Sequence, residues 1–280
     1  LLLWSLPDDG RWRGEPEGLP SLNPAAVNSL AEGSGPEELH ELTVELGLDD
    51  LDGEGPDLEG LLLRRDRARA AHFVNAHTLN HANGDTAYRQ VLGRAEHLFG
   101  DGTGVRWAVR ALHGVQLRAN LNGTDLVPYF MRRAARRRPR VFLLGTREEV
   151  LRGAATAVER EFDGWSVAGL HHGFFGDAED RRVLDLVNAS QADLLLVAMG
   201  NPRQETWIDR HLERLDVPLA MGVGALFDYW AGAERRAPLW MQRAGMEWVY
   251  RMLFQQGKLT RYLFGNPEFL WHVARAKWRF

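Results

Sequence analysis

A dense group of polar side chains follows one apolar run in the second half of the chain. The run at 193–198 is typical of a buried strand, and it leads through Gly-Asn-Pro into Arg203, Gln204 and Glu205. The guanidinium of Arg203 and the amide of Gln204 would stand at the start of a helix, where unpaired N–H groups favour anions. This spacing makes Asn201 and Gln204 candidate ligand-binding residues.

A carboxylate follows another short apolar run at 96–99. Asp101 and Gly102 begin the sequence Asp-Gly-Thr-Gly, whose glycines let the backbone approach a ligand closely. A carboxylate held against a hydroxyl group can act as a general base. The glycines do not form G-x-G-x-x-G, so a dinucleotide fingerprint is not indicated. A turn-forming or helix-capping role for Asp101 is equally compatible with the sequence.

Two amides and a hydroxyl lie close together after the apolar run at 71–75. Asn75, Thr78 and Asn80 could hydrogen-bond a base or sugar hydroxyls, although Asn75 or Thr78 could instead cap a helix. His77 and His81 are four residues apart, but no third ligand follows at helical spacing. We therefore expect no zinc site here.

A further glycine-rich turn follows the apolar run at 218–223. Gly224 lies in this turn, and Asp228 could accept hydrogen bonds from a ribose or another sugar. Arg235 and Arg236 come next, and arginines pair strongly and with defined geometry to phosphates. This segment is a candidate for contacts with a phosphorylated sugar or nucleotide.

The elements that would carry these residues alternate between short apolar runs and amphipathic stretches. Strands are predicted at 42–46, 71–75, 96–99, 140–144, 166–169, 193–198 and 218–223. Helices are predicted at 58–70, 83–94, 103–112, 124–137, 147–161, 178–190, 203–214, 236–256 and 266–277. This alternation indicates an α/β fold, a mainly parallel Rossmann-like sheet with helices on both faces and a helical C-terminal appendage. The polar groups would then meet at the carboxyl edge of the sheet.

Composition narrows the class of protein. The 280 residues are 45% hydrophobic and 26% charged, as expected of a globular chain. The absence of cysteine excludes disulfides and thiolate chemistry. No apolar run approaches the length of a membrane span. Two carboxylates in an Asp-x-Asp string can hold a metal ion, and the one such string is Asp50-Leu51-Asp52. It lies in an acidic segment away from the strong strand ends, so we expect chemistry that does not depend on a metal.

Charge and composition divide the chain into three parts. Residues 1–38 read as an acidic, Pro/Gly-rich extension, 39–234 as the α/β domain and 235–280 as a basic, Trp-rich helical appendage. Residues 1–60 hold 15 acidic residues against two arginines, whereas 235–280 hold nine basic residues against two acidic ones. Such opposite ends are either solvated faces or partner sites.

The order of the motifs resembles one known family. From 42 to 264 the chain carries NAHTLN, DGTG, NGTDL, FLLG, HGFF, GNPRQE, GVGALFDYWAG, RRAPLWMQRAGMEWVYR and RY. This order is similar to that of the WecG/TagA/CpsF glycosyltransferases, and the stretch from Gly200 to Arg251 is its most specific part. The resemblance implies an inverting transferase without a cofactor. Such an enzyme moves N-acetylmannosamine, or its uronic acid, from UDP to a polyprenyl-diphosphate-linked N-acetylglucosamine in cell-surface polysaccharide synthesis.

The resemblance also implies roles for residues. Asp101 matches the family's general base, and arginines of the appendage would close over the diphosphate. Together with the residues at the strand ends, the expected substrate-binding set is Asn75, Thr78, Asn80, Gly102, Asp125, Asn201, Gln204, Gly224, Asp228, Arg236, Arg251 and Arg261. Family members usually carry an arginine shortly before the Gly-x-Asp at 123–125, where this chain has Asn120. Either Arg118 takes that role or diphosphate binding relies on the appendage.

The appendage suggests where such an enzyme would work. Its aromatic residues Trp240, Trp248, Phe254, Trp271 and Trp278 interleave with Arg and Lys, as in helices that lie on anionic membrane surfaces. We expect a cytoplasmic protein, peripheral at the inner face of the cell membrane, although these aromatics could instead pack on the core. Nucleic acid is not an expected partner, and a homo-oligomer is compatible with the sequence. The alternatives are an inactive UDP-sugar-binding or assembly protein and, less favoured, a Rossmann-type oxidoreductase.

Overall fold

The computed structural model describes residues 58–113, 121–243, 245–254 and 259–277. The expected extension at 1–38, the strand at 42–46, Arg118, Asn120 and Trp278 lie outside these residues. The three-part division of the chain stays a prediction.

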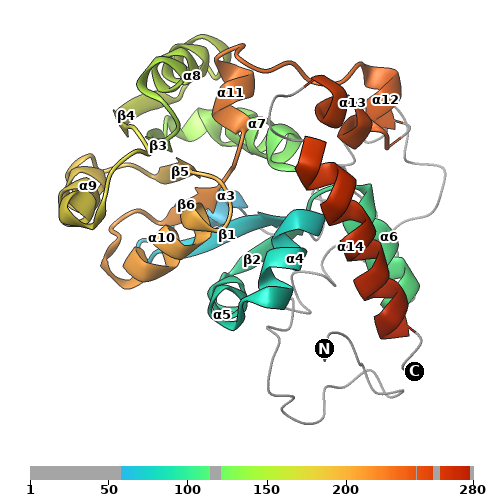
Figure 1. Cartoon of the computed structure of the whole chain (residues 1–280). Helices are drawn as coiled ribbons and strands as arrows, with labels where there is room; N and C mark the ends of the chain where they lie inside the picture. Colours follow the sequence, from blue (N-terminus) through green and yellow to red (C-terminus); the bar gives the residue numbers. More distant parts are fainter. Residues whose placement is uncertain (1–57, 114–120, 244, 255–258, 278–280) are drawn as a thin grey trace.

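One parallel sheet organises the molecule (Figure 1). Its strands are β1 (Arg69–Val74), β2 (His97–Gly100), β3 (Arg140–Gly145), β4 (Ser166–His171), β5 (Leu194–Ala198) and β6 (Leu219–Gly222). They run in the order β2-β1-β6-β5-β3-β4, and every neighbouring pair is parallel. All strands therefore end at the same edge, which confirms the expected α/β fold.

Helices connect and cover the strands. Before and between the first strands lie α3 (Leu58–Leu61), α4 (Ala76–Gly84), α5 (Thr86–Gly93), α6 (Thr103–His113), α7 (Gly123–Ala134) and the 3-10 turn η2 (Ala135–Arg137). The later elements are α8 (Glu148–Glu161), α9 (Asp177–Ala189), α10 (Arg203–His211), η3 (Leu212–Arg214), α11 (Leu226–Trp230), α12 (Leu239–Arg243), α13 (Glu247–Phe254) and α14 (Leu259–Lys277).

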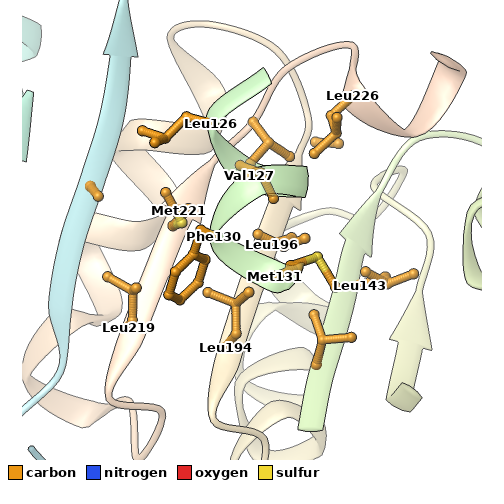
Figure 2. Packing of buried hydrophobic residues seen from close by; sticks show 14 of the residues in the cluster. Leu126, Val127, Phe130, Met131, Leu143, Leu194, Leu196, Leu219, Met221 and Leu226 are labelled. Atoms are coloured by element: carbon orange, nitrogen blue, oxygen red, sulfur yellow. The ribbon is translucent and has the colours of Figure 1, made fainter. Parts of the chain in front are cut away.

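Alternating strand residues bury both faces of the sheet. On one face Leu194, Leu196 and Met221 pack against α7, α8 and α11, and Figure 2 shows Phe130 and other α7 side chains lying over these strands. On the other face residues such as Leu195 pack against α4, α5, α9 and α10. Continuous burial on both faces is typical of a parallel sheet. It holds the strand ends, and so the loops after them, in fixed positions.

The predicted helix at 58–70 is wrong beyond its first turn. Only Leu58–Leu61 is helical, and Arg69 already begins β1. The Arg69 guanidinium donates hydrogen bonds to the carbonyls of Arg64 and Arg67, each at 3.0 Å, and pairs with Asp66. These bonds stabilise a turn, and the apolar residues that follow pair with both neighbouring strands instead of continuing the helix.

Two other predicted helices are divided. The segment at 83–94 belongs to α4 and α5, because Asp85 ends α4 and its side chain accepts a hydrogen bond from the Tyr88 N–H at the start of α5. The segment at 236–256 forms α12 and α13, which are separated around Gly245 at φ 68°. A Cβ on Gly245 would meet the Thr103 side chain at 2.6 Å, so a glycine is needed there.

The last helix packs onto the α/β core. In Figure 1, α14 runs beside α4 and α6, and Phe269 and Val273 of α14 form a buried cluster with Ala108 of α6. Within the described part of the chain, no helix is both long and apolar enough to cross a membrane.

Candidate active site

A pocket of about 320 Å³ opens at the carboxyl edge of the sheet, where β1, β2, β5 and β6 end. In open α/β sheets this edge is where ligands bind. Seven residues expected from the sequence line the pocket: Asn75, Asp101, Asn201, Gln204, Gly224, Asp228 and Arg251. The structure thus brings together residues that span 176 positions of the chain.

Gln204 joins the loop after β5 to the loop after β6. Its side-chain oxygen accepts hydrogen bonds from the backbone N–H groups of Gly200 and Gly224, each at 3.1 Å. The side chain is only 2% exposed. A Cβ on Gly222 would lie 3.0 Å from the Gln204 amide nitrogen, so the glycine leaves the space that this amide occupies. Gln204 therefore shapes the floor of the pocket as well as lining it.

A buried carboxylate, that of Glu205, holds the side chains of Gln204 and Asn201 in place. Glu205 is fully buried, and it accepts hydrogen bonds from the side chains of Gln204 at 2.7 Å, Asn201 at 2.6 Å and Tyr88 at 3.1 Å. Burial raises the pKa of the Glu205 carboxyl, while these three donors act in the opposite direction. Burial and the nearby Glu205 also raise the pKa of Tyr88. The hydrogen bond to this buried carboxylate fixes the side chain of Asn201, which also lines the pocket.

Asn75 and Thr78 form the capping arrangement that the sequence left open. The Asn75 side chain accepts hydrogen bonds from the N–H groups of His77 and Thr78, each at 3.1 Å, and the Thr78 hydroxyl accepts from the Asn75 N–H at 3.3 Å. This is a capping box at the start of α4. Asn75 still lines the pocket, whereas Thr78 is fully buried and does not.

Asp101 directly follows β2 and lines the pocket beside the end of β1. Its backbone N–H donates to the Val74 carbonyl at 2.9 Å, which extends the pairing of the two strands to the pocket itself. Gly102 follows with φ 98°, a conformation that favours glycine. This pairing fixes the backbone that carries the carboxylate.

Asn80 contacts the last helix. Its side-chain amide donates to the Gly265 carbonyl at 2.8 Å and to Glu268 at 3.3 Å. In the structure Asn80 therefore tethers α14 to α4. Arg261 lies on α14, but its side chain is outside the described part.

Asp125 and Arg236 pair with each other. Both Arg236 terminal nitrogens contact the Asp125 carboxylate, and Asn122 donates to the same carboxylate at 2.7 Å. Burial acts to lower the pKa of Arg236, but the hydrogen bond and charge of Asp125 outweigh it and raise that pKa. Arg236 also lies 3.6 Å from Glu247, which pairs with Arg251.

Sequence reasoning missed several lining residues. Asn122, the N-cap of α7, lines the pocket with Gly123 and Thr124 of the first turn of that helix. Tyr229 of α11 and Glu234, which follows α11, also line it. For the first group, the sequence signal was an asparagine directly before a predicted helix, which is a preferred N-cap residue. In the structure the Asn122 side chain accepts a hydrogen bond from the Asp125 N–H at 3.0 Å. Among the described residues there is no cluster of three or more metal-ligating side chains.

The fold and the pocket define an α/β protein with a polar site at the carboxyl edge of a parallel sheet. Residues 56–280 match the profile of the glycosyl transferase WecG/TagA/CpsF family. Two proteins of Staphylococcus aureus, from strains COL and MW2, are 33% identical over 206 residues, which is 73% of this chain and 79% of each relative. Both relatives are named N-acetylglucosaminyldiphosphoundecaprenol N-acetyl-beta-D-mannosaminyltransferase. The chain belongs to the WecG/TagA/CpsF family of glycosyl transferases, which confirms the resemblance.

Proposed function

We propose that this chain transfers N-acetylmannosamine from a UDP-sugar to N-acetylglucosamine carried on a polyprenyl diphosphate. The observation that carries the proposal is that one pocket combines the Asp101 carboxylate with the Arg251 guanidinium. The first is suited to deprotonating an acceptor hydroxyl, and the second to binding a diphosphate. The names of the 33% identical relatives support the same donor sugar and acceptor.

The chemistry is a single displacement. The acceptor hydroxyl oxygen attacks the anomeric carbon of the donor sugar from the face opposite UDP. The new C–O bond forms as the bond to the diphosphate breaks, and the bonding electrons leave with UDP. Asp101 accepts the hydroxyl proton during this attack. The leaving diphosphate gains negative charge, which a fixed cation such as Arg251 would stabilise.

The names of the relatives distinguish between two possible donor sugars. Both 33% identical relatives are named as N-acetyl-beta-D-mannosaminyltransferases, and neither name mentions a uronic acid. We therefore favour N-acetylmannosamine itself over its uronic acid, two donors between which the sequence motifs do not distinguish.

The last helices support a peripheral membrane role. Large apolar side chains on α12, α13 and α14 are exposed, namely Leu239, Trp240, Trp248, Leu253, Phe254, Leu270 and Trp271. Phe269 and Val273 pack inward on the core, so α14 has a buried side and an exposed one. Exposed aromatics among basic residues suit an anionic lipid surface, where a polyprenyl-linked acceptor would reside.

Donor choice tests this function. The purified chain would be given a short polyprenyl-diphosphate-linked N-acetylglucosamine together with UDP-N-acetylmannosamine, its uronic acid or UDP-N-acetylglucosamine, and UDP release would be measured. We expect release with UDP-N-acetylmannosamine and little with the other two donors. Binding of UDP without acceptor-dependent release from any donor would instead indicate an inactive sugar-nucleotide-binding protein.

A further inference from the structure

Glu247 stands between two arginines of the C-terminal segment. One carboxylate oxygen accepts hydrogen bonds from the Arg251 Nε at 3.1 Å and from its Nη2 at 2.7 Å, and the other lies 3.6 Å from the Arg236 Nη2. The side chains of Glu247 and Arg251 are 17% and 20% exposed. Low exposure strengthens such charged contacts compared with those on an open surface.

Arg251 lines the pocket, whereas Glu247 does not line it and contacts Arg251 instead. The Arg251 guanidinium also lies over the Tyr229 ring, 5.6 Å from its centroid. Arg251 and Tyr229 both line the pocket. A carboxylate behind the guanidinium and an aromatic ring beside it thus restrict its orientation from two directions.

The same carboxylate links this arginine to the core. Arg236 is anchored by Asp125 in the first turn of α7. Asn122 donates a hydrogen bond to Asp125 and also lines the pocket. The chain of contacts therefore runs from Asn122 through Asp125, Arg236 and Glu247 to Arg251. Its two ends line the pocket, and its members come from α7 and its N-cap, the segment before α12, and α13.

We propose that Glu247 is a positioning residue that holds Arg251 in the orientation needed to bind the donor diphosphate. The proposal rests on the proposed function of the pocket. Arg251 lines the pocket, and its Nε and Nη2 both donate to one Glu247 oxygen, which limits the directions in which the guanidinium can turn.

A simple helix-stabilising role is the competing explanation. Glu247 begins α13 and pairs with Arg251 four residues later, and such pairs on exposed helices contribute only tenths of a kcal/mol. The chain offers a matched control in α8, where Glu148 pairs with Arg152 at the same spacing and 2.6 Å, with side chains 44% and 70% exposed. A role in helix stability alone would make the two glutamates equivalent.

Binding of UDP and of uridine to four proteins tests the proposal: wild type, E247Q, R251A and the double variant. We expect E247Q and R251A each to weaken UDP binding about tenfold or more, and the double variant to be no weaker than R251A. Uridine binding should stay unchanged in all four, because uridine has no diphosphate for Arg251 to meet. E148Q should bind UDP like the wild type.

Three outcomes would overturn the proposal: unchanged UDP binding in E247Q, additive losses in the double variant, or equal losses for UDP and uridine. If E247Q does not fold, E247D is used instead. It keeps the negative charge at the start of α13, but its shorter side chain draws the carboxylate away from Arg251, so we expect weaker UDP binding and unchanged uridine binding. Sugar transfer by the wild type is measured separately. A failure of the proposed transferase activity would therefore be distinguishable from a failure of the Glu247 assignment.

Discussion

The side-chain oxygen of Gln204 lies 3.1 Å from the backbone nitrogen of Gly224, although the two residues belong to loops after different strands. The same oxygen accepts the Gly200 N–H, so a single amide joins the ends of β5 and β6. Gly200 and Gly224 have φ values of 77° and 55°, which only glycine adopts readily. The floor of the pocket thus depends on one buried side chain.

Replacing Gln204 with alanine should destabilise the protein. The change leaves two loop N–H groups without their acceptor and removes one donor from the buried Glu205. We expect a loss of about 1–3 kcal/mol in the free energy of unfolding, measured by urea denaturation. Q90A, at an exposed position on α5, is the control and should change stability by less than about 0.5 kcal/mol. Equal stability of Q204A and Q90A would show that this amide does not hold the loops.

Stability should fall in mild acid because of His72. This histidine is 1% exposed on β1, and among the described residues neither of its ring nitrogens has a hydrogen-bond partner. Burial lowers the pKa of His72 from 6.5 to about 4. Between these values the unfolded chain binds a proton that the folded chain does not, so stability is complete above pH 6.5 and falls toward pH 4.

The variant H72L isolates this effect. A loss of up to about 3 kcal/mol over this pH range is expected for the wild type from His72 alone. Glu205 has a raised pKa and contributes with the opposite sign, but it is present in both proteins. The free energy of unfolding of H72L should therefore vary less steeply with pH over this range. Parallel pH profiles for the two proteins would contradict the assignment.

Membrane binding should depend on exposed aromatic residues of the last helices. We expect the double variant W240S/F254S to bind anionic phospholipid vesicles at least about tenfold more weakly than the wild type, since each side chain would lose buried apolar contact with lipid. The control is F174S, because Phe174 is 66% exposed, close to the 63% of Trp240, but lies in the loop after β4. Equal losses in both proteins would indicate nonspecific adsorption.

Metal removal should leave sugar transfer intact. Asp50 and Asp52, which form the single Asp-x-Asp string, lie outside the described residues, and our account assigns stabilisation of the leaving diphosphate to arginine. Turnover in excess EDTA should equal turnover with added Mg²⁺ or Mn²⁺. Loss of activity with EDTA and its recovery with either ion would contradict this expectation.

The sequence predicted the sheet well because parallel strands bury both faces and so appear as short apolar runs. The same topology explains why residues as distant as Asn75 and Asp228 could be assigned to one site. The predicted helix at 58–70 failed, because its arginines resemble the outer face of a helix, whereas Arg69 stabilises a turn through backbone carbonyls.

Contacts between distant segments could not be predicted in this way. Arg236 was expected to meet a phosphate, but in the structure it pairs with Asp125, and this pairing depends on how α7 and the C-terminal segment pack. Glu247 received no role from the sequence, since a glutamate at the start of a helix is common. Its position between two arginines is visible only in three dimensions.

The most direct test is whether wild type and D101N form the disaccharide product from UDP-N-acetylmannosamine and the lipid-linked acceptor. Product formation is measured by mass spectrometry. The variant keeps the size of the side chain but removes the base. We predict that the wild type adds one N-acetylhexosamine to the acceptor and that D101N does so at least about 100-fold more slowly, with unchanged UDP binding. Wild-type protein that forms no product, or D101N that retains the full rate, would contradict the account.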